Sequence, residues 1–111
     1  MTTQPNNNED PKVVEEIDIE EFAKSNPGIG APVAKSYRIR IDKTIKVVAT
    51  ATITGRQILA LVDKTPEAYK LYEHSGGRQP IPVGPDEVVD LREPGVERFT
   101  TMAKDHTEGA R

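Results

Sequence analysis

Residues 37–63 constrain the fold of this 111-residue chain more than any other stretch. Apolar residues alternate with arginines over 37–42, which is the period-two pattern of a strand that buries one face. A second alternating run follows over 45–53, and the short polar segment between the two runs predicts an antiparallel hairpin. The alternation assigns Ile45 and Val47 to the buried face, together with the later odd-numbered positions of this run.

A helix is predicted to follow the hairpin directly. Thr54 and Gln57 match a capping box, in which a hydroxyl precedes the first turn and an amide follows three residues later. Ile58 and Leu59 begin an apolar stripe at helical spacing behind this cap. We expect the stripe to pack on the apolar face of the hairpin. Because two strands and one helix are too few for a stable domain, the rest of the chain must supply more sheet.

Two further strands are predicted downstream, over 69–74 and 96–102, with Leu71 and Phe99 as their core residues. Residues 86–91 fit either one turn of helix or a short strand. The order is therefore hairpin, helix, strand, irregular crossover and final strand. It allows the first and last strands to lie side by side at the centre of the sheet. We predict an α+β fold of the β-grasp type, a mixed sheet with one helix.

The first 36 residues differ in composition from the rest. They carry a net charge of −4, whereas residues 37–111 carry +1. Residues 1–11 are polar and rich in asparagine, which predicts disorder. We therefore expect a flexible acidic arm over 1–36, a folded domain over 37–102 and a mobile tail over 103–111.

Residues 13–23 interleave apolar side chains with acids, and two interpretations remain open. The segment is either a solvated linker or a short linear motif that adds itself to a partner as a strand. In the second case Ile17, Ile19 and Phe22 are the candidate binding residues.

Composition excludes several function classes. Cysteine is absent, which removes disulfides, thiolate catalysis and cysteine-based metal sites. The net charge of −3 gives no general case for nucleic-acid binding. No apolar run approaches the length of a membrane span and no secretory signal pattern is present, so we expect a soluble, cytoplasmic protein that does not bind membranes. His74 and His106 are the only histidines, and their spacing predicts no metal site.

The ordered set YRIRIDK, ITGRQILAL, AYKLYEH, DEVVDL and GVERFTTM resembles the bacterial ubiquitin-like domains of the multiubiquitin family. Members are encoded beside activating (E1-like), conjugating (E2-like) and deubiquitinase-like proteins in antiphage defence operons. The resemblance covers about 37–102. It implies a modifier rather than an enzyme, joined to target proteins through a C-terminal glycine, with ATP used by the E1-like partner and no cofactor bound here. Gly109 is the candidate glycine, and a deubiquitinase-like peptidase would first have to remove Ala110 and Arg111.

A second candidate site lies on the face of the sheet that points away from the predicted helix. Five residues are expected there, namely Arg38, Arg40, Lys70, Tyr72 and Arg98. In ubiquitin-like proteins the exposed position beside the core leucine of the third strand is central to recognition, and Tyr72 matches it. The basic face would also attract the acidic segment 13–23, its own or that of a neighbouring copy, so self-association through the arm is a further expectation.

Two other functions remain open beside the modifier. One is a β-grasp module that binds partners through its sheet face and arm without any covalent bond. The other is a sulfur carrier of the same fold, which is disfavoured because the chain lacks a terminal diglycine.

Overall fold

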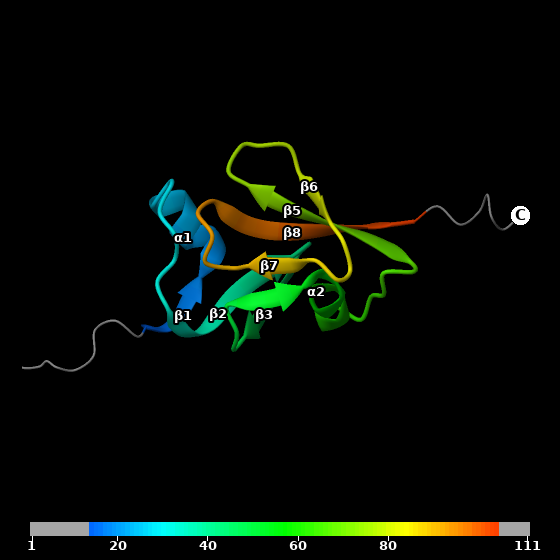
Figure 1. Cartoon of the computed structure of the whole chain (residues 1–111), viewed down its shortest axis with the longest axis horizontal. Coiled ribbons are helices and arrows are strands. Elements are labelled where there is room, and N and C mark those ends of the chain that lie inside the picture. The colour runs from blue at the N-terminus through cyan, green and yellow to red at the C-terminus, as the bar shows by residue number, and fades with distance from the viewer. Residues whose placement is uncertain (1–13, 105–111) are drawn as a thin grey trace, which may run out of the picture.

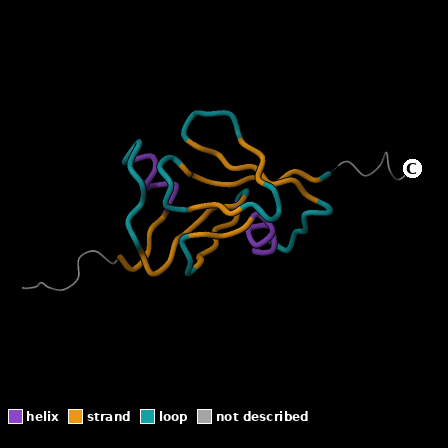
Figure 2. The backbone as a smooth tube through the Cα atoms, in the orientation of Figure 1, coloured by secondary structure: helices purple, strands orange, loops and turns teal. Residues whose placement is uncertain are grey.

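The computed structural model describes residues 14–104, which form a six-stranded sheet, a two-stranded sheet and two helices. The elements are β1 (Val14–Asp18), α1 (Ile19–Ser25), β2 (Ala34–Ile41), β3 (Thr44–Val48), β4 (Thr52–Thr54), α2 (Gly55–Leu61), β5 (Tyr69–Ser75), β6 (Ile81–Val83), β7 (Val88–Asp90) and β8 (Val96–Ala103). The two helices lie well apart along the long axis of the molecule (Figure 2).

The predicted centre of the sheet is confirmed. β2 and β8 run parallel and side by side, with Ile41 opposite Phe99 (Figure 1). β3 forms the expected hairpin with β2, while β5 pairs antiparallel with β8 and β6 extends the sheet beyond β5. This arrangement of a mixed sheet with a helix after the hairpin is the β-grasp fold that the sequence predicted.

The capped helix is also confirmed. The backbone N–H of Gln57 donates to Oγ1 of Thr54 at 3.2 Å, and the backbone N–H of Thr54 donates to Oε1 of Gln57 at 2.9 Å. Both halves of the capping box are therefore formed, and the orphan N–H groups of the first turn are satisfied. Ile58 and Leu59 are buried against the sheet as predicted.

The prediction that Ile45 and Val47 are buried is wrong, because the turn sets a different register. β2 and β3 are joined by a two-residue turn in which Asp42 has a positive φ of 56°, and Ile41 lies opposite Thr44. Every second residue from Thr44 therefore shares the core face of Ile41, and the residues between them point outward. Ile45 and Val47 are 49% and 52% exposed.

The run over 45–53 is also not one strand. β3 ends at Val48 and β4 begins at Thr52, where it leaves the main sheet and pairs with β7. The segment that fitted either a helical turn or a strand is thus a strand, and its Val89 lies opposite Ile53 in the core.

The predicted flexible arm over 1–36 and the single predicted helix are wrong for the segment 14–36. β1 pairs parallel with β2 in a register that puts Asp18 opposite Arg38, and α1 follows at once. Ile17 and Ile19 are only 7% and 1% exposed, so the segment contributes to the core. Residues 1–13 and 105–111 lie outside the described residues, and so does the predicted disorder of 1–11.

The place where β1 gives way to α1 has a geometric reason. Because Ile41 is opposite Phe99 in a parallel pair, β8 begins at the level of Arg38, where β1 ends. β8 thus occupies the position beside β2 from this point on, and the chain must leave the sheet. Asp18 caps the new helix by accepting a hydrogen bond from the N–H of Glu21 at 3.1 Å.

The core lies between the sheet and α2 and includes the buried side chains of Tyr37, Ile39, Leu71 and Phe99. Over the described residues 14–104, neither helix has the length and apolar character needed to cross a membrane.

Candidate interaction site on the open face of the sheet

One face of the main sheet points away from the core, and we call it the open face. Ile41 and Phe99 are paired and both face the core, so Arg40 and the neighbours of Phe99 in β8 point the other way. In the same way Tyr72 lies opposite Thr100 on the open face. The open face comprises Arg38, Arg40, Ile45, Val47, Lys70, Tyr72, His74, Arg98, Thr100 and Met102.

All five residues predicted for this face lie on it, whereas three apolar residues were missed. Ile45, Val47 and Met102 are each about half exposed. The short turn between β2 and β3 was the signal that could have placed Ile45 and Val47 outward, because a two-residue turn fixes which residues oppose each other. Exposed apolar side chains flanked by cations are typical of protein-recognition surfaces.

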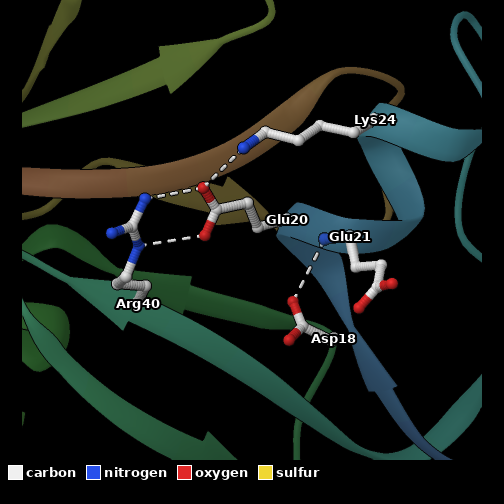
Figure 3. A network of polar contacts seen from close by, with 5 residues as sticks. All are labelled: Asp18, Glu20, Glu21, Lys24 and Arg40. Atoms are coloured by element: carbon white, nitrogen blue, oxygen red, sulfur yellow. Dashed lines mark hydrogen bonds and ion pairs between the residues drawn. The ribbon is translucent and has the colours of Figure 1, made fainter.

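The two arginines of β2 are held by the N-terminal segment of the same chain. Arg40 makes a bidentate pair with Glu20, with Nε to Oε1 at 2.9 Å and Nη2 to Oε2 at 2.7 Å (Figure 3). Lys24 reaches the same carboxylate at 3.1 Å, and Arg38 pairs with Glu16. The expected attraction between the acidic segment and the basic face therefore exists within one molecule.

Electrostatics at Glu20 are consistent with this pairing. Burial by itself raises the pKa of Glu20, but hydrogen bonds and charges from Arg40 and Lys24 outweigh burial and lower the pKa below its ordinary value of 4.5. The carboxylate is therefore ionised at neutral pH, and much of the positive charge of Arg40 is neutralised. Lys70 and Arg98 make no ion pair among the described residues, which leaves them as free cations of the open face.

The assignment of Ile17, Ile19 and Phe22 to partner binding needs correction. Ile17 and Ile19 are in the core of the domain, and Phe22 is half-buried against the same core. Their apolar spacing serves the packing of β1 and α1 on the sheet. In this conformation the three side chains do not form a free surface for another protein.

The aromatic centre of the open face is flanked by a neutral histidine. Tyr72 is half-buried, and Nε2 of His74 lies 2.8 Å from Oγ1 of Thr100. Burial and the nearby Arg98 lower the pKa of His74 below 6.5. The neutral form of the ring therefore predominates at pH 7, and Tyr72 has this ring as its neighbour on the same face of β5.

The last strand is tied down close to its end. The backbone N–H of Thr101 donates to Oδ1 of Asp42 at 2.8 Å, and Oγ1 of Thr101 donates to Oδ2 at 2.6 Å. The backbone N–H of Lys104 donates to the carbonyl of Ala68 at 2.8 Å. The tail predicted to start at residue 103 therefore starts later, because Ala103 belongs to β8 and Lys104 is still bonded to the domain. The conjugation residue Gly109, with Ala110 and Arg111, lies outside the described residues.

A hollow of about 590 Å³ opens between α1 and the turn that precedes β8. Its walls carry charges of both signs, including Lys24, Arg78 and Glu93, and contain no histidine. Burial raises the pKa of Glu73 in this wall, and the nearby charge of Glu93 raises it further. A hydrogen bond from Ser75 acts in the opposite direction but is outweighed. Within residues 14–104 no group of three His, Asp or Glu side chains is placed to hold a metal ion.

The family model described as Multiubiquitin matches residues 37–104 of the chain. The chain belongs to the multiubiquitin family. It is thus a ubiquitin-like protein, and its small domain is that of a modifier or adaptor that contacts other proteins rather than an enzyme. No curated protein and no solved structure matches the chain. The matched part begins at Tyr37, so β1 and α1 precede the family domain although they pack against it.

Proposed function

We propose that this multiubiquitin-family protein is a conjugatable modifier. In this proposal a peptidase trims the chain to Gly109, an E1-like enzyme activates the new C-terminus, and an E2-like enzyme attaches it to target proteins. The observation that carries the proposal is the position of β8 in a ubiquitin-like fold. The strand is central, is clamped near its end by Asp42, and leads directly into the segment that holds Gly109.

For activation and transfer, the modifier has to supply only an accessible carboxylate on its C-terminal glycine. The E1-like enzyme joins this carboxylate to AMP at the expense of ATP, releasing pyrophosphate, and a nucleophile of the enzyme then displaces AMP. Glycine suits this role because it has no Cβ and tolerates backbone angles that are closed to other residues. Gly109 follows Lys104 by five residues, which gives a reach of at most about 17 Å at roughly 3.3 Å per residue.

Recognition by the enzymes is assigned to the open face. Tyr72 offers a large, partly buried aromatic group, which is the residue class that dominates binding energy at interfaces. Ile45 and Val47 add exposed apolar area on β3. Lys70 and Arg98, which make no ion pair among the described residues, supply positive charge. We place the whole pathway in the bacterial cytoplasm, in antiphage defence, because the family resemblance implies that setting.

The experiment incubates the full chain with the E1-like, E2-like and peptidase-like proteins encoded beside it, plus ATP, and records intact masses. We expect loss of Ala110 and Arg111, followed by an adduct on the E1-like and E2-like proteins. Gly109→Glu should abolish the adduct, whereas His106→Glu, which adds the same charge to the same tail, should retain it. A chain that ends at Gly109 should load without the peptidase, and one that ends at Glu108 should not.

A second candidate function is a binding module that never forms a covalent bond. The observation that favours it is the exposed apolar and cationic surface of the open face, which needs no free tail to act. The same experiment separates the two, because absence of trimming and of any adduct in the complete mixture would exclude the modifier. Binding of the unmodified chain to one of the neighbouring proteins would then support the module.

A further inference from the structure

Residues 14–25 form β1 and α1, which pack together on one surface of the rest of the chain. We call these residues the exchange unit, or the unit, and the surface that they cover its site. β1 supplies a parallel strand along β2 from Val14, opposite Ala34, to Asp18, opposite Arg38. α1 then packs beside β2 and β8 at the start of β8. The buried side chains of Ile17, Ile19 and Ala23 fix the unit against the core.

Ion pairs between the unit and β2 add to the apolar contacts that hold the unit in its site. The acids of the unit, Glu16 and Glu20, face Arg38 and Arg40 of β2, and the Glu20 pair is bidentate. The side chain of Ser36 also donates to the carbonyl of Glu15 at 3.2 Å. A strand followed by a helix, with acids at positions 16 and 20 and the buried Ile17 and Ile19 between them, is thus what the site accepts.

The connection between the unit and its site is held by few bonds. One backbone bond crosses the turn, from the N–H of Ile29 to the carbonyl of Asn26 at 3.1 Å. Beyond it, the N–H of Ala31 donates to the carbonyl of Arg92 at 2.9 Å, and Nε of Arg92 donates back to Ala31. Asn26 still caps α1, because its backbone N–H and its Nδ2 both donate to the carbonyl of Phe22. Residues 27–29 are therefore a short hinge between two well-anchored parts.

Two exposed apolar residues lie on or beside this hinge, namely Ile29 and Val33. In a closed molecule they face solvent, which is unfavourable for side chains of this size. If two copies exchange their units, each hinge runs from one copy to the other, so Ile29 of the hinge lies between the two copies. Exchange of an identical element keeps every other native contact and is a low-cost route to association.

We propose that the unit 14–25 of one copy binds the site of a second copy, so that chains associate without a covalent bond by exchanging β1 and α1. The partner is a second copy of this chain, and the recognition elements are the strand edge of β2 with Arg38 and Arg40. This association does not depend on the proposed conjugation, since neither the open-face tyrosine nor the C-terminal tail takes part.

Charge reversal gives a direct test, because it makes exchange favourable only between two different variants. In full chains, Glu20→Arg sets two cations against each other within one molecule, and Arg40→Glu sets two acids against each other. When the two variants are refolded together, an exchanged heterodimer restores both pairs, since each unit meets a site of opposite charge. The chain with both changes restores the pair within a single molecule and is the matched control.

We expect the co-refolded mixture, with one variant isotopically labelled, to give a one-to-one heterodimer of twice the 12.2 kDa chain mass in native mass spectrometry. We expect no comparable dimer from either single variant alone or from the double variant. A mixture in which labelled and unlabelled chains do not pair above the level of the double variant would overturn the proposal.

Hinge length provides a second test that leaves the charges intact. Deleting residues 27–29 removes the length needed to fold back, so this chain should be an obligate dimer with the circular dichroism of the wild type. Inserting three glycines at the same place should instead favour the monomer. A deletion variant that is a folded monomer, or that fails to fold even at high concentration, would contradict exchange.

Discussion

The carboxylate of Asp42 joins the hairpin turn to the last strand, and Asp42→Asn tests how firmly the end of β8 is held. The carboxylate accepts three hydrogen bonds, two from Thr101 at 2.8 and 2.6 Å and one from Nζ of Lys64 at 3.2 Å. Asparagine keeps the size of the side chain and tolerates the positive φ of 56° at this position. It has one acceptor oxygen instead of two and carries no charge.

The expected loss follows from these contacts. Exchanging a charged for a neutral acceptor costs about 1 kcal/mol at the backbone N–H of Thr101, since hydrogen bonds to charged groups contribute roughly twice as much as neutral ones. The pair with Lys64 is partly exposed, so its loss costs only about 0.5–1 kcal/mol. The hydrogen bond from the hydroxyl of Thr101 is weakened as well. We therefore expect the free energy of unfolding to fall by about 2 kcal/mol in total, which is about a 30-fold fall in the folded-to-unfolded ratio.

Urea denaturation at several pH values measures this loss. Burial raises the pKa of Asp42, but the hydrogen bonds from Thr101 and Lys64 outweigh burial and lower the pKa below 3.8. The stabilisation is therefore fully present above pH 3.8 and is lost as the pH falls through the pKa of the folded state. The difference between wild type and Asp42→Asn should accordingly shrink toward pH 2.

Asp63→Asn is the matched control, because Asp63 also has a positive φ, at 59°, and no side-chain hydrogen bond among the described residues. It should change stability by less than about 0.5 kcal/mol. An Asp42→Asn loss as small as that of the control, or one that is independent of pH, would refute the assigned network.

Three further predictions concern the core and the open face. Tyr37→Phe removes a buried hydroxyl that accepts the N–H of Ala34 at 2.9 Å, so the free energy of unfolding should fall by about 1–2 kcal/mol in urea titrations. The double change Ile45→Ser and Val47→Ser should leave that free energy within about 1 kcal/mol, since both side chains are exposed, yet weaken binding to the E1-like protein at least about 10-fold in calorimetry. Folding lowers the pKa of His74, so the wild type should lose stability relative to His74→Gln as the pH falls below 6.5, and equal pH profiles would contradict this.

The sequence predicted the elements that depend on local chemistry. The capping box at Thr54 and the apolar stripe behind it involve residues within two turns of helix, and both are present. The pairing of β2 with β8 followed from the order of the elements, because in a β-grasp fold these two strands occupy the centre of the sheet. Leu71 and Phe99 were correctly predicted as core residues, because each is the bulky apolar residue of a short strand.

Long-range pairing was harder to predict. The alternation in β3 suggested a buried Ile45, but the outcome was set by a two-residue turn that fixes the partner of Thr44. The acids interleaved with apolar residues over 13–23 kept a solvated linker open as one interpretation, because nothing local shows that Arg38 and Arg40 neutralise Glu16 and Glu20. The prediction for Gly109 concerns residues beyond the described part of the chain and stays a prediction.

The position of β1 and α1 gives the molecule a polarity. They lie at one end of the sheet, and β8 runs from their side to its end at Ala103 on the other (Figure 1). Eight strand residues at about 3.3 Å each put roughly 26 Å between the exchange unit and the start of the tail. A copy attached to a target through its tail would therefore point its exchange unit outward. Two modified targets could then be joined by exchange between their attached copies, so a single conjugation event on each of two targets would be enough to pair them.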